Sequence, residues 1–302
     1  MRKTIGFLLL IIAAVFFTSC KNNSQDTVSD ENKLRISVTF NALAEFASAV
    51  GQDKAEVSTI IPAGMEPHDF EPKAADITKL GKAQLFIYNG LGMEAWAEDA
   101  VKAAGNEALI AVNASEGAAP ISNEEEEEIK EHGEYDPHLW LSIKGAEIEV
   151  QNIADAMTEA DPSNKDYYQN NAKDYIDQLE SLFKEYEDKF SDLNNKNFVT
   201  GHAAFNYFCR DFGLSQNSVE DVFAEGEPST RQLVDLVEYC EENKVGTIFS
   251  EEMASSEISQ TLANEVGADV ETIYTMEGPE DDLSYLDRMR SNCEKVYQSL
   301  AK

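Results

Sequence analysis

The chain has 302 residues, 42% of them hydrophobic and 27% charged, which excludes wholesale disorder and is enough for about two globular domains. Acidic residues outnumber basic residues 57 to 24, and the formal net charge of -33 excludes nucleic acid and anionic headgroups as favoured partners, which leaves cations. The four cysteines, Cys20, Cys209, Cys240 and Cys293, contain no closely spaced zinc-binding pair, so other residues would have to hold a metal.

The N-terminus has the layout of a secretory signal. A basic start at Arg2 precedes an apolar run from Ile5 to Phe17 that is too short to span a bilayer, so we expect cleavage. Cys20 stands at the expected cut and resembles the acylated cysteine of bacterial lipoproteins, with phenylalanine in place of the usual leucine. We predict a signal peptide at 1–19 and a lipid-anchored flexible tether at 20–33; an unmodified cysteine after an ordinary signal peptide is the alternative.

From residue 34 onward, short β-rich runs alternate with amphipathic stretches, a pattern typical of βαβ units and a parallel sheet. We expect strands at Arg35–Phe40, Val57–Ile61, Leu85–Tyr88, Leu109–Val112 and Leu139–Leu141, and helices at Ala42–Val50, Ala74–Lys82 and Met93–Ala104. This pattern predicts an N-terminal α/β lobe over residues 34–160.

The segment at 123–136 is dense in like charges, including Glu124 to Glu128, and predicts an extended, solvated loop. Its one soft donor, His132, would allow weak metal capture. A loop that only keeps the protein soluble is an equally valid interpretation.

A long helix is predicted within residues 161–194. Apolar residues from Tyr168 to Leu193 recur at helical spacing, and Asp161-Pro162 supplies an N-cap and a first-turn proline. Such a helix would be on the order of 45 Å long, enough to run along two lobes and oppose wide hinge bending. A dimerising coiled coil is the alternative interpretation.

The strand pattern returns after this helix and predicts a C-terminal α/β lobe over residues 195–302. We expect its strands near Phe198–Thr200, Val219–Phe223, Thr247–Phe249 and Val270–Tyr274. The predicted fold is therefore α/β, with two lobes that are each a parallel-sheet α/β sandwich, joined by one long rigid helix.

Three of the four histidines, His68, His138 and His202, lie in short turns flanked by proline or glycine, each at a predicted strand-to-helix boundary. Ligands of open α/β sheets bind at the carboxyl ends of the strands. Three imidazoles and a carboxylate would make a four-coordinate site suited to Zn(II) between the lobes. The second lobe would supply the carboxylate, and spacing alone does not choose among Glu251, Glu252, Glu277, Asp281 and Asp282.

Several motifs in order resemble the metal-binding substrate-binding lipoproteins of bacterial ABC importers. They include EPHDFEP at 66–72, DPHLWL at 136–141 and TGHAAF at 200–205, and the likeness extends from about residue 34 to residue 300. The resemblance implies two α/β lobes joined by one long helix, with His68, His138 and His202 as the first three ligands. A histidine at the third position resembles the zinc branch, because manganese members usually carry a harder oxygen donor there.

The resemblance also implies a fourth ligand, since Glu277-Gly278 matches a pair that supplies it in part of the zinc branch. Water or Asp282 are the alternatives. Ligating imidazoles usually donate their second N–H to a carboxylate or carbonyl, and Asp69, Glu71, Asp136 and Glu251 are the nearby acids.

The expected function is an extracytoplasmic, lipid-anchored monomer that captures Zn(II) and hands it to an ABC permease driven by a cytoplasmic ATPase. Binding of manganese or another divalent metal, or a role as a surface adhesin, is the alternative. The chain is not expected to be an enzyme, because it has no HExxH motif and Glu277 would close the position at which zinc activates water. Release of the metal is expected to loosen His202 and Glu277.

Overall fold

The computed structural model describes residues 33–123, 129, 133–222, 228–251, 256–279 and 281–301. The signal peptide, Cys20 and all but the last residue of the tether lie outside these residues, as does His132. Among the described residues, no helix is both long enough and apolar enough to cross a bilayer.

The first lobe is built on a four-stranded sheet of order β2-β1-β3-β4 in which every pairing is parallel. Its strands are β1 (Leu34–Val38), β2 (Ala55–Thr59), β3 (Leu85–Tyr88) and β4 (Ile110–Asn113). Its helices are α1 (Asn41–Gly51), α2 (Ala74–Leu80), α3 (Ala97–Ala104) and α5 (Ile143–Ala160), with short 3-10 turns η2 (Gln52–Lys54) and η3 (Leu139–Leu141). Helix α1 forms because its apolar residues recur every three to four positions, and it buries Leu43, Phe46, Ala47 and Val50.

The second lobe repeats this topology with a parallel sheet of order β6-β5-β7-β8. Its strands are β5 (Asn197–Thr200), β6 (Ser215–Ser218), β7 (Thr247–Glu251) and β8 (Asp269–Ile273). Its helices are α7 (Asn206–Phe212), α8 (Thr230–Asn243), α9 (Ser256–Val266) and α10 (Tyr285–Leu300). The fold class expected from the sequence, with two parallel-sheet lobes, is confirmed.

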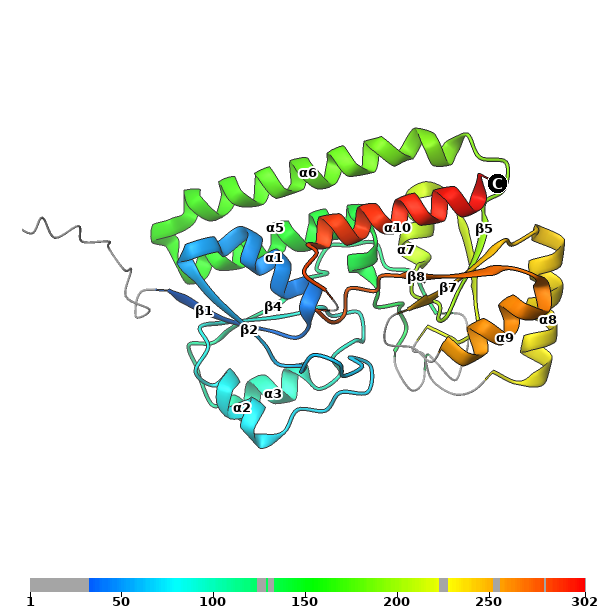
Figure 1. The fold of residues 1–302 in the computed structure, drawn as a ribbon. Coiled ribbons are helices and arrows are strands. Elements are labelled where there is room, and N and C mark those ends of the chain that lie inside the picture. Colours follow the sequence, from blue (N-terminus) through cyan, green and yellow to red (C-terminus); the bar gives the residue numbers. More distant parts are fainter. Residues whose placement is uncertain are drawn as a thin grey trace, which may run out of the picture. The chain divides into compact units, whose positions relative to one another are not determined.

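Helix α6 (Lys165–Ser191) joins the lobes (Figure 1). Its 27 residues span about 40 Å. A 3-10 turn over Pro162–Asn164 precedes it, and the Asp161 carboxylate accepts a bond of 2.9 Å from the Tyr168 hydroxyl in the first helical turn. The helix packs against α1 and α5 of the first lobe and against α7 and α10 of the second. One continuous apolar cluster therefore runs from the first sheet through α6 to α10, and a smaller cluster lies under α8 and α9.

Some local predictions are wrong. Leu139–Leu141 is a buried 3-10 turn rather than a strand, because the carbonyls of Pro137, His138 and Leu139 bond to amides two or three residues ahead. The strand predicted at Val219–Phe223 lies earlier, at Ser215–Ser218, and the helix predicted from Met93 begins at Ala97. Helix α5 was not predicted.

The three described cysteines, Cys209, Cys240 and Cys293, are buried thiols that form no disulfide. Residues at the base of the acidic loop are tied together, since Ser122 pairs with Tyr135 in an antiparallel bridge and Asn123 N–H donates to the Glu134 carbonyl. The segments 124–128 and 130–132 of that loop lie outside the described residues.

Candidate metal site

Four side chains predicted as metal ligands come together at the carboxyl ends of four strands. His68 follows β2, His138 follows β4, His202 follows β5 and Glu277 follows β8. One ligand atom from each lies within 4.8 Å of the others, and the other candidate acids of the described residues are not part of this group. The parallel sheets explain the convergence, because the loops after their strands all leave from the same edge.

The spacing of the histidine nitrogens suits a four-coordinate zinc ion. The Nε2 atoms of His68 and His138 are 3.1 Å apart, and those of His202 and His138 are 3.3 Å apart. Two nitrogen ligands of a tetrahedral zinc lie about 3.3 Å from each other, given the usual Zn–N bond length. The Glu277 Oε1 atom is 3.9 Å from His138 Nε2.

His138 is oriented by Asp136. The Asp136 Oδ1 atom accepts bonds of 2.9 Å from both the backbone N–H and the Nδ1–H of His138, which leaves the Nε2 lone pair for a metal. The second carboxylate oxygen accepts from the Asn206 amide at 2.9 Å. Asp136 is 1% exposed, so its negative charge acts on the ring with little screening by water.

His202 is positioned through its backbone by Glu251, the last residue of β7. Glu251 Oε1 accepts the N–H groups of Gly201 and His202 at 3.1 and 3.2 Å. A Cβ atom on Gly201 would lie 1.9 Å from Glu251 Oε2, so only glycine leaves room for this carboxyl group. Burial, with a smaller effect of His138, lowers the pKa of His202 well below its ordinary value. The imidazole is therefore neutral at pH 7, which is the form that binds metal.

Glu277 is held by groups of both lobes. The Thr275 hydroxyl donates to Glu277 Oε2 at 3.1 Å, and the Asn41 N–H at the start of α1 donates to the Glu277 backbone carbonyl at 3.1 Å. The indole N–H of Trp140 donates to the Thr275 carbonyl at 2.7 Å. Neither Asn41 nor Thr275 was predicted, because both are common residues whose role depends only on the packing around them.

The remaining predicted acids lie elsewhere. Asp69 and Glu71 have exposed side chains, and Asp282 is exposed as well. Asp281 pairs with Arg288 of α10. Glu252 and His132 lie outside the described residues. Of the four acids expected to support the histidines, Asp136 contacts His138 and Glu251 contacts His202.

A further buried acid, Glu94, supports the loop after β3. Glu94 accepts bonds from the Thr39 hydroxyl and from the N–H groups of Asn89 and Gly90, at 2.6, 2.9 and 3.0 Å. Burial raises the pKa of Glu94 to about 6, although these hydrogen bonds act in the opposite direction. The Asn89 amide donates to the Pro137 carbonyl at 2.8 Å, directly before His138. Asn89 therefore supports the histidine loop as well as a turn.

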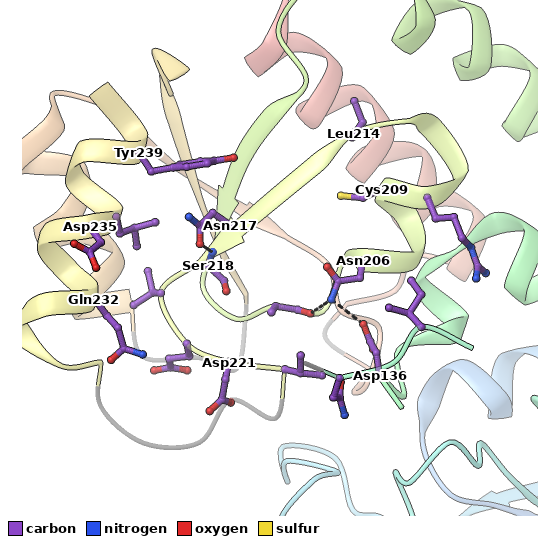
Figure 2. A pocket seen from close by; sticks show the side chains of 18 of the residues that line it. Asp136, Asn206, Cys209, Leu214, Asn217, Ser218, Asp221, Gln232, Asp235 and Tyr239 are labelled. Atoms are coloured by element: carbon purple, nitrogen blue, oxygen red, sulfur yellow. Dashed lines mark hydrogen bonds between the residues drawn. The ribbon is translucent and has the colours of Figure 1, made fainter. Parts of the chain in front are cut away.

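A cavity of about 1040 Å³ lies beside this site, between α7, β6 and α8 (Figure 2). Figure 2 shows the Asn206 amide directed at Asp136 on its wall. None of the four grouped side chains is among its described lining residues. The cavity therefore reaches the carboxylate behind His138 and not the position where the four ligand atoms meet.

Comparison with known proteins gives the family. Residues 36–299 match the family described as zinc-uptake complex component A, periplasmic. The chain is 39% identical over 309 residues to the high-affinity zinc uptake system protein ZnuA of Bacillus subtilis (strain 168), covering 97% of each chain.

Two solved structures share the fold. The Zn(II)-bound structure of a mutant variant of AdcAII of Streptococcus pneumoniae has a TM-score of 0.82 and 32% identity, covering 89% of this chain and 99% of that one. The laminin-binding protein Lmb of Streptococcus agalactiae, described as bifunctional with adhesin and metal transporting activity, has a TM-score of 0.81, 32% identity and the same coverage. The chain therefore belongs to the zinc-uptake complex component A family.

Proposed function

We propose that this protein captures Zn(II) between its two lobes outside the cytoplasm and delivers it to an ABC permease, whose cytoplasmic ATPase drives import. The observation that carries this proposal is the convergence of three imidazole nitrogens and one carboxylate within 4.8 Å. Three of these residues are fully enclosed, with His138 at 0%, His202 at 4% and Glu277 at 6% exposure. A buried carboxylate with no cation beside it would be costly, and a bound divalent metal offsets that cost.

The proposed ligands are His68, His138, His202 and Glu277. Zinc is favoured over manganese because three of the four donors are imidazoles, whereas manganese prefers carboxylate, carbonyl and water oxygens. The match to a zinc-uptake family supports the same cargo. With Glu277 bound, zinc has no open position for a reactive water, so the site is proposed to bind and not to catalyse.

The proposed organisation of the whole chain follows the sequence predictions. Residues 1–19 are a signal peptide, and Cys20 carries a lipid that ties the tether of residues 20–33 to the cell membrane. The lobes extend over 34–160 and 195–302, with the linking helix at 161–194 between them. The protein acts as a monomer, and His132 in the acidic loop collects zinc weakly.

Elemental analysis of the purified protein, followed by competition titration of the metal-free form with Zn(II) and Mn(II), tests the proposal. We expect one zinc per chain and displacement of manganese by zinc. A preparation with no bound metal and no saturable zinc binding would contradict it, and a preference for manganese would contradict the choice of cargo.

The His202→Ala variant tests the placement of the site between the lobes. We expect the zinc affinity to fall at least tenfold while the metal-free variant stays folded, because the removed ring lies in a loop at the edge of the sheet. His132→Ala is the matched control and is expected to keep the native affinity. An unchanged affinity in folded His202→Ala protein would contradict the site.

A second function, adhesion to laminin, is favoured by the similarity to Lmb. The proposal is tested by binding of the purified protein to immobilised laminin, with and without zinc. Saturable binding would add this function to metal capture, and no binding above that of an unrelated acidic protein would remove it.

A further inference from the structure

The segment between β8 and α10 carries Glu277, and the first lobe holds it in place. Figure 1 shows the chain leaving β8 and passing the end of α1 before α10 begins. Trp140 of the first lobe donates to the Thr275 carbonyl at 2.7 Å, and Asn41 N–H donates to the Glu277 carbonyl at 3.1 Å. Two hydrogen bonds from the first lobe therefore bracket Met276.

Met276 has an unusual backbone conformation for a residue that is not glycine. Its φ angle is +60°, in the left-handed region, and its side chain is fully buried. Such a conformation persists only where neighbouring contacts determine it. The placement of Glu277, the next residue, thus depends on contacts outside its own segment.

Arg288 makes several of the contacts that hold this segment. Its side chain is 2% exposed and lies between two carboxylates. The guanidinium donates to Glu45 Oε1 on α1 at 2.7 Å, and to Asp281 at 3.0 Å through the Oδ1 atom and at 3.1 Å through the backbone carbonyl. The same arginine therefore joins helix α1 of the first lobe to the segment that carries Glu277. Glu277 lies four residues before Asp281 in this segment.

A second set of hydrogen bonds also joins the first lobe to the segment between β8 and α10. Glu45 Oε2 accepts the Tyr285 N–H at 2.6 Å, and the Tyr285 hydroxyl donates to the Trp140 carbonyl at 2.6 Å. Trp140 is also the residue that bonds Thr275. The contacts form a closed set around the segment, from Glu45 through Arg288 and Tyr285 to Trp140.

We propose that Arg288 is a positioning residue for the metal ligand Glu277, which it ties to helix α1 of the first lobe through Glu45 and Asp281. This inference rests on the proposed function. It assigns the placement of Glu277 to the first lobe although the residue follows the last strand of the second. The sequence led us to expect that the second lobe supplies Glu277 and that Glu277 loosens when the metal is released. The contacts of Arg288 instead hold Glu277 against the first lobe.

The arrangement predicts what truncation of Arg288 does. Without the guanidinium, Glu45 and Asp281 repel each other and the segment loses its charged link to α1. Glu277 then occupies its ligand position for a smaller fraction of the time, and the zinc dissociates faster. His138 and His202 are positioned by Asp136 and Glu251 instead, and we expect the histidines to keep their arrangement.

The test measures zinc dissociation by stopped flow, with excess chelator, from the purified protein and its variants. We expect Arg288→Met to dissociate zinc at least tenfold faster. Glu45→Gln, which keeps the shape of its side chain, is expected to have the same direction and a smaller size, and it serves if Arg288→Met does not fold. Arg290→Met is the matched control, since Arg290 lies on the same helix and pairs with Glu185 of α6 instead; we expect a change of less than twofold.

A double-mutant cycle separates positioning from a general loss of structure. In a Glu277→Gln background, adding Arg288→Met is expected to change the dissociation rate by less than twofold. The visible spectrum of the cobalt(II)-loaded Arg288→Met protein is expected to shift towards that of Glu277→Gln. An unchanged rate in folded Arg288→Met, or an equally large effect in both backgrounds, would overturn the inference.

These outcomes are distinct from failure of the proposed function. If the native protein binds no zinc, the proposed function fails and no dissociation rate exists. If the native protein binds zinc and His202→Ala weakens it, but the Arg288 variants behave as native, only the role of Arg288 fails.

Discussion

Asp136→Asn tests whether the carboxylate behind His138 tunes the metal site. In the native protein, one oxygen accepts two bonds from His138 and the other accepts the Asn206 amide. The asparagine oxygen can still accept from the ring. Its NH₂ group, however, faces the Asn206 NH₂, so a donor meets a donor, and the ring loses the full negative charge that makes Nε2 a stronger ligand.

The magnitude follows from this geometry. Removing a group that orients a ligating histidine lowers metal affinity about 10- to 100-fold, which is about 1.4–2.7 kcal/mol of binding free energy. Asp136→Asn keeps one acceptor for the ring, so we expect a fall of about tenfold. Asp136→Ala removes both oxygens and is expected to approach the 100-fold limit.

Zinc affinity is measured by competition with a chromophoric chelator, and the stability of the metal-free proteins by urea unfolding. The control is Asp211→Asn, because the Asp211 carboxylate on α7 accepts bonds from the Ser142 hydroxyl and the Lys144 N–H but contacts no histidine of the site. It is expected to lose stability and keep the zinc affinity. Native affinity in folded Asp136→Asn, or an equal loss of affinity in Asp211→Asn, would refute the role of Asp136.

Two further predictions concern stability. Glu149 in α5 is fully buried with no hydrogen-bond partner among the described residues for either carboxyl oxygen, and burial, then the charge of Glu94, raises its pKa well above the ordinary value. The native state therefore keeps a proton that the unfolded chain loses above about pH 4.5. Urea unfolding from pH 5 to 8 should show the stability of native protein relative to Glu149→Gln falling by up to about 1.4 kcal/mol per pH unit. The control is Glu159→Gln, at an exposed position of the same helix, which leaves Glu149 in place and is expected to keep the pH slope of the native protein. Equal pH slopes for native and Glu149→Gln would contradict the prediction. Zinc at 100 times its Kd should raise the free energy of unfolding by about 2.7 kcal/mol, reversibly with EDTA; an equal gain in His202→Ala would show that zinc binds elsewhere.

The alternation of strands and helices was predictable because it is a local property. Strands buried on both faces are continuous apolar runs, as in β3, and amphipathic helices such as α1 repeat every three to four residues. The predicted parallel sheets and two lobes are confirmed by the strand pairings. The positions of the histidines in loops after strands follow from the same local pattern.

The errors in individual strands and helices arose where the residue types of a segment do not reflect how deeply the segment is buried. Strand β6 has the sequence Ser-Gln-Asn-Ser, which is unlike a typical strand, because it lies at the edge of the second sheet and pairs only with β5. Leu139–Leu141 is apolar because it is buried against α5 and α7, and an apolar run of this length does not distinguish a strand from a turn. Helix α5 was missed because it buries Glu149 on the face that packs against the core.

The choice of the fourth acid needed long-range information. Five acids at or after the ends of the last two strands of the second lobe are equally good candidates for the fourth ligand when only the sequence is considered. The resemblance to a family alone favoured Glu277. In the structure, Glu277 is the one described acid grouped with the three histidines, while Asp281 faces Arg288 and Glu251 lies behind His202. Its role as a ligand stays a prediction until the metal is measured.

The composition, the helix and strand periods and the three histidine turns thus determined the class of fold and the kind of metal site, because each depends on neighbours within a few residues. Tertiary structure alone decided which groups hold Glu277 in place. Asn41, Trp140 and Arg288 act across separations of up to 243 residues, as between Glu45 and Arg288, and no local pattern records contacts that form only when both lobes pack on helix α6.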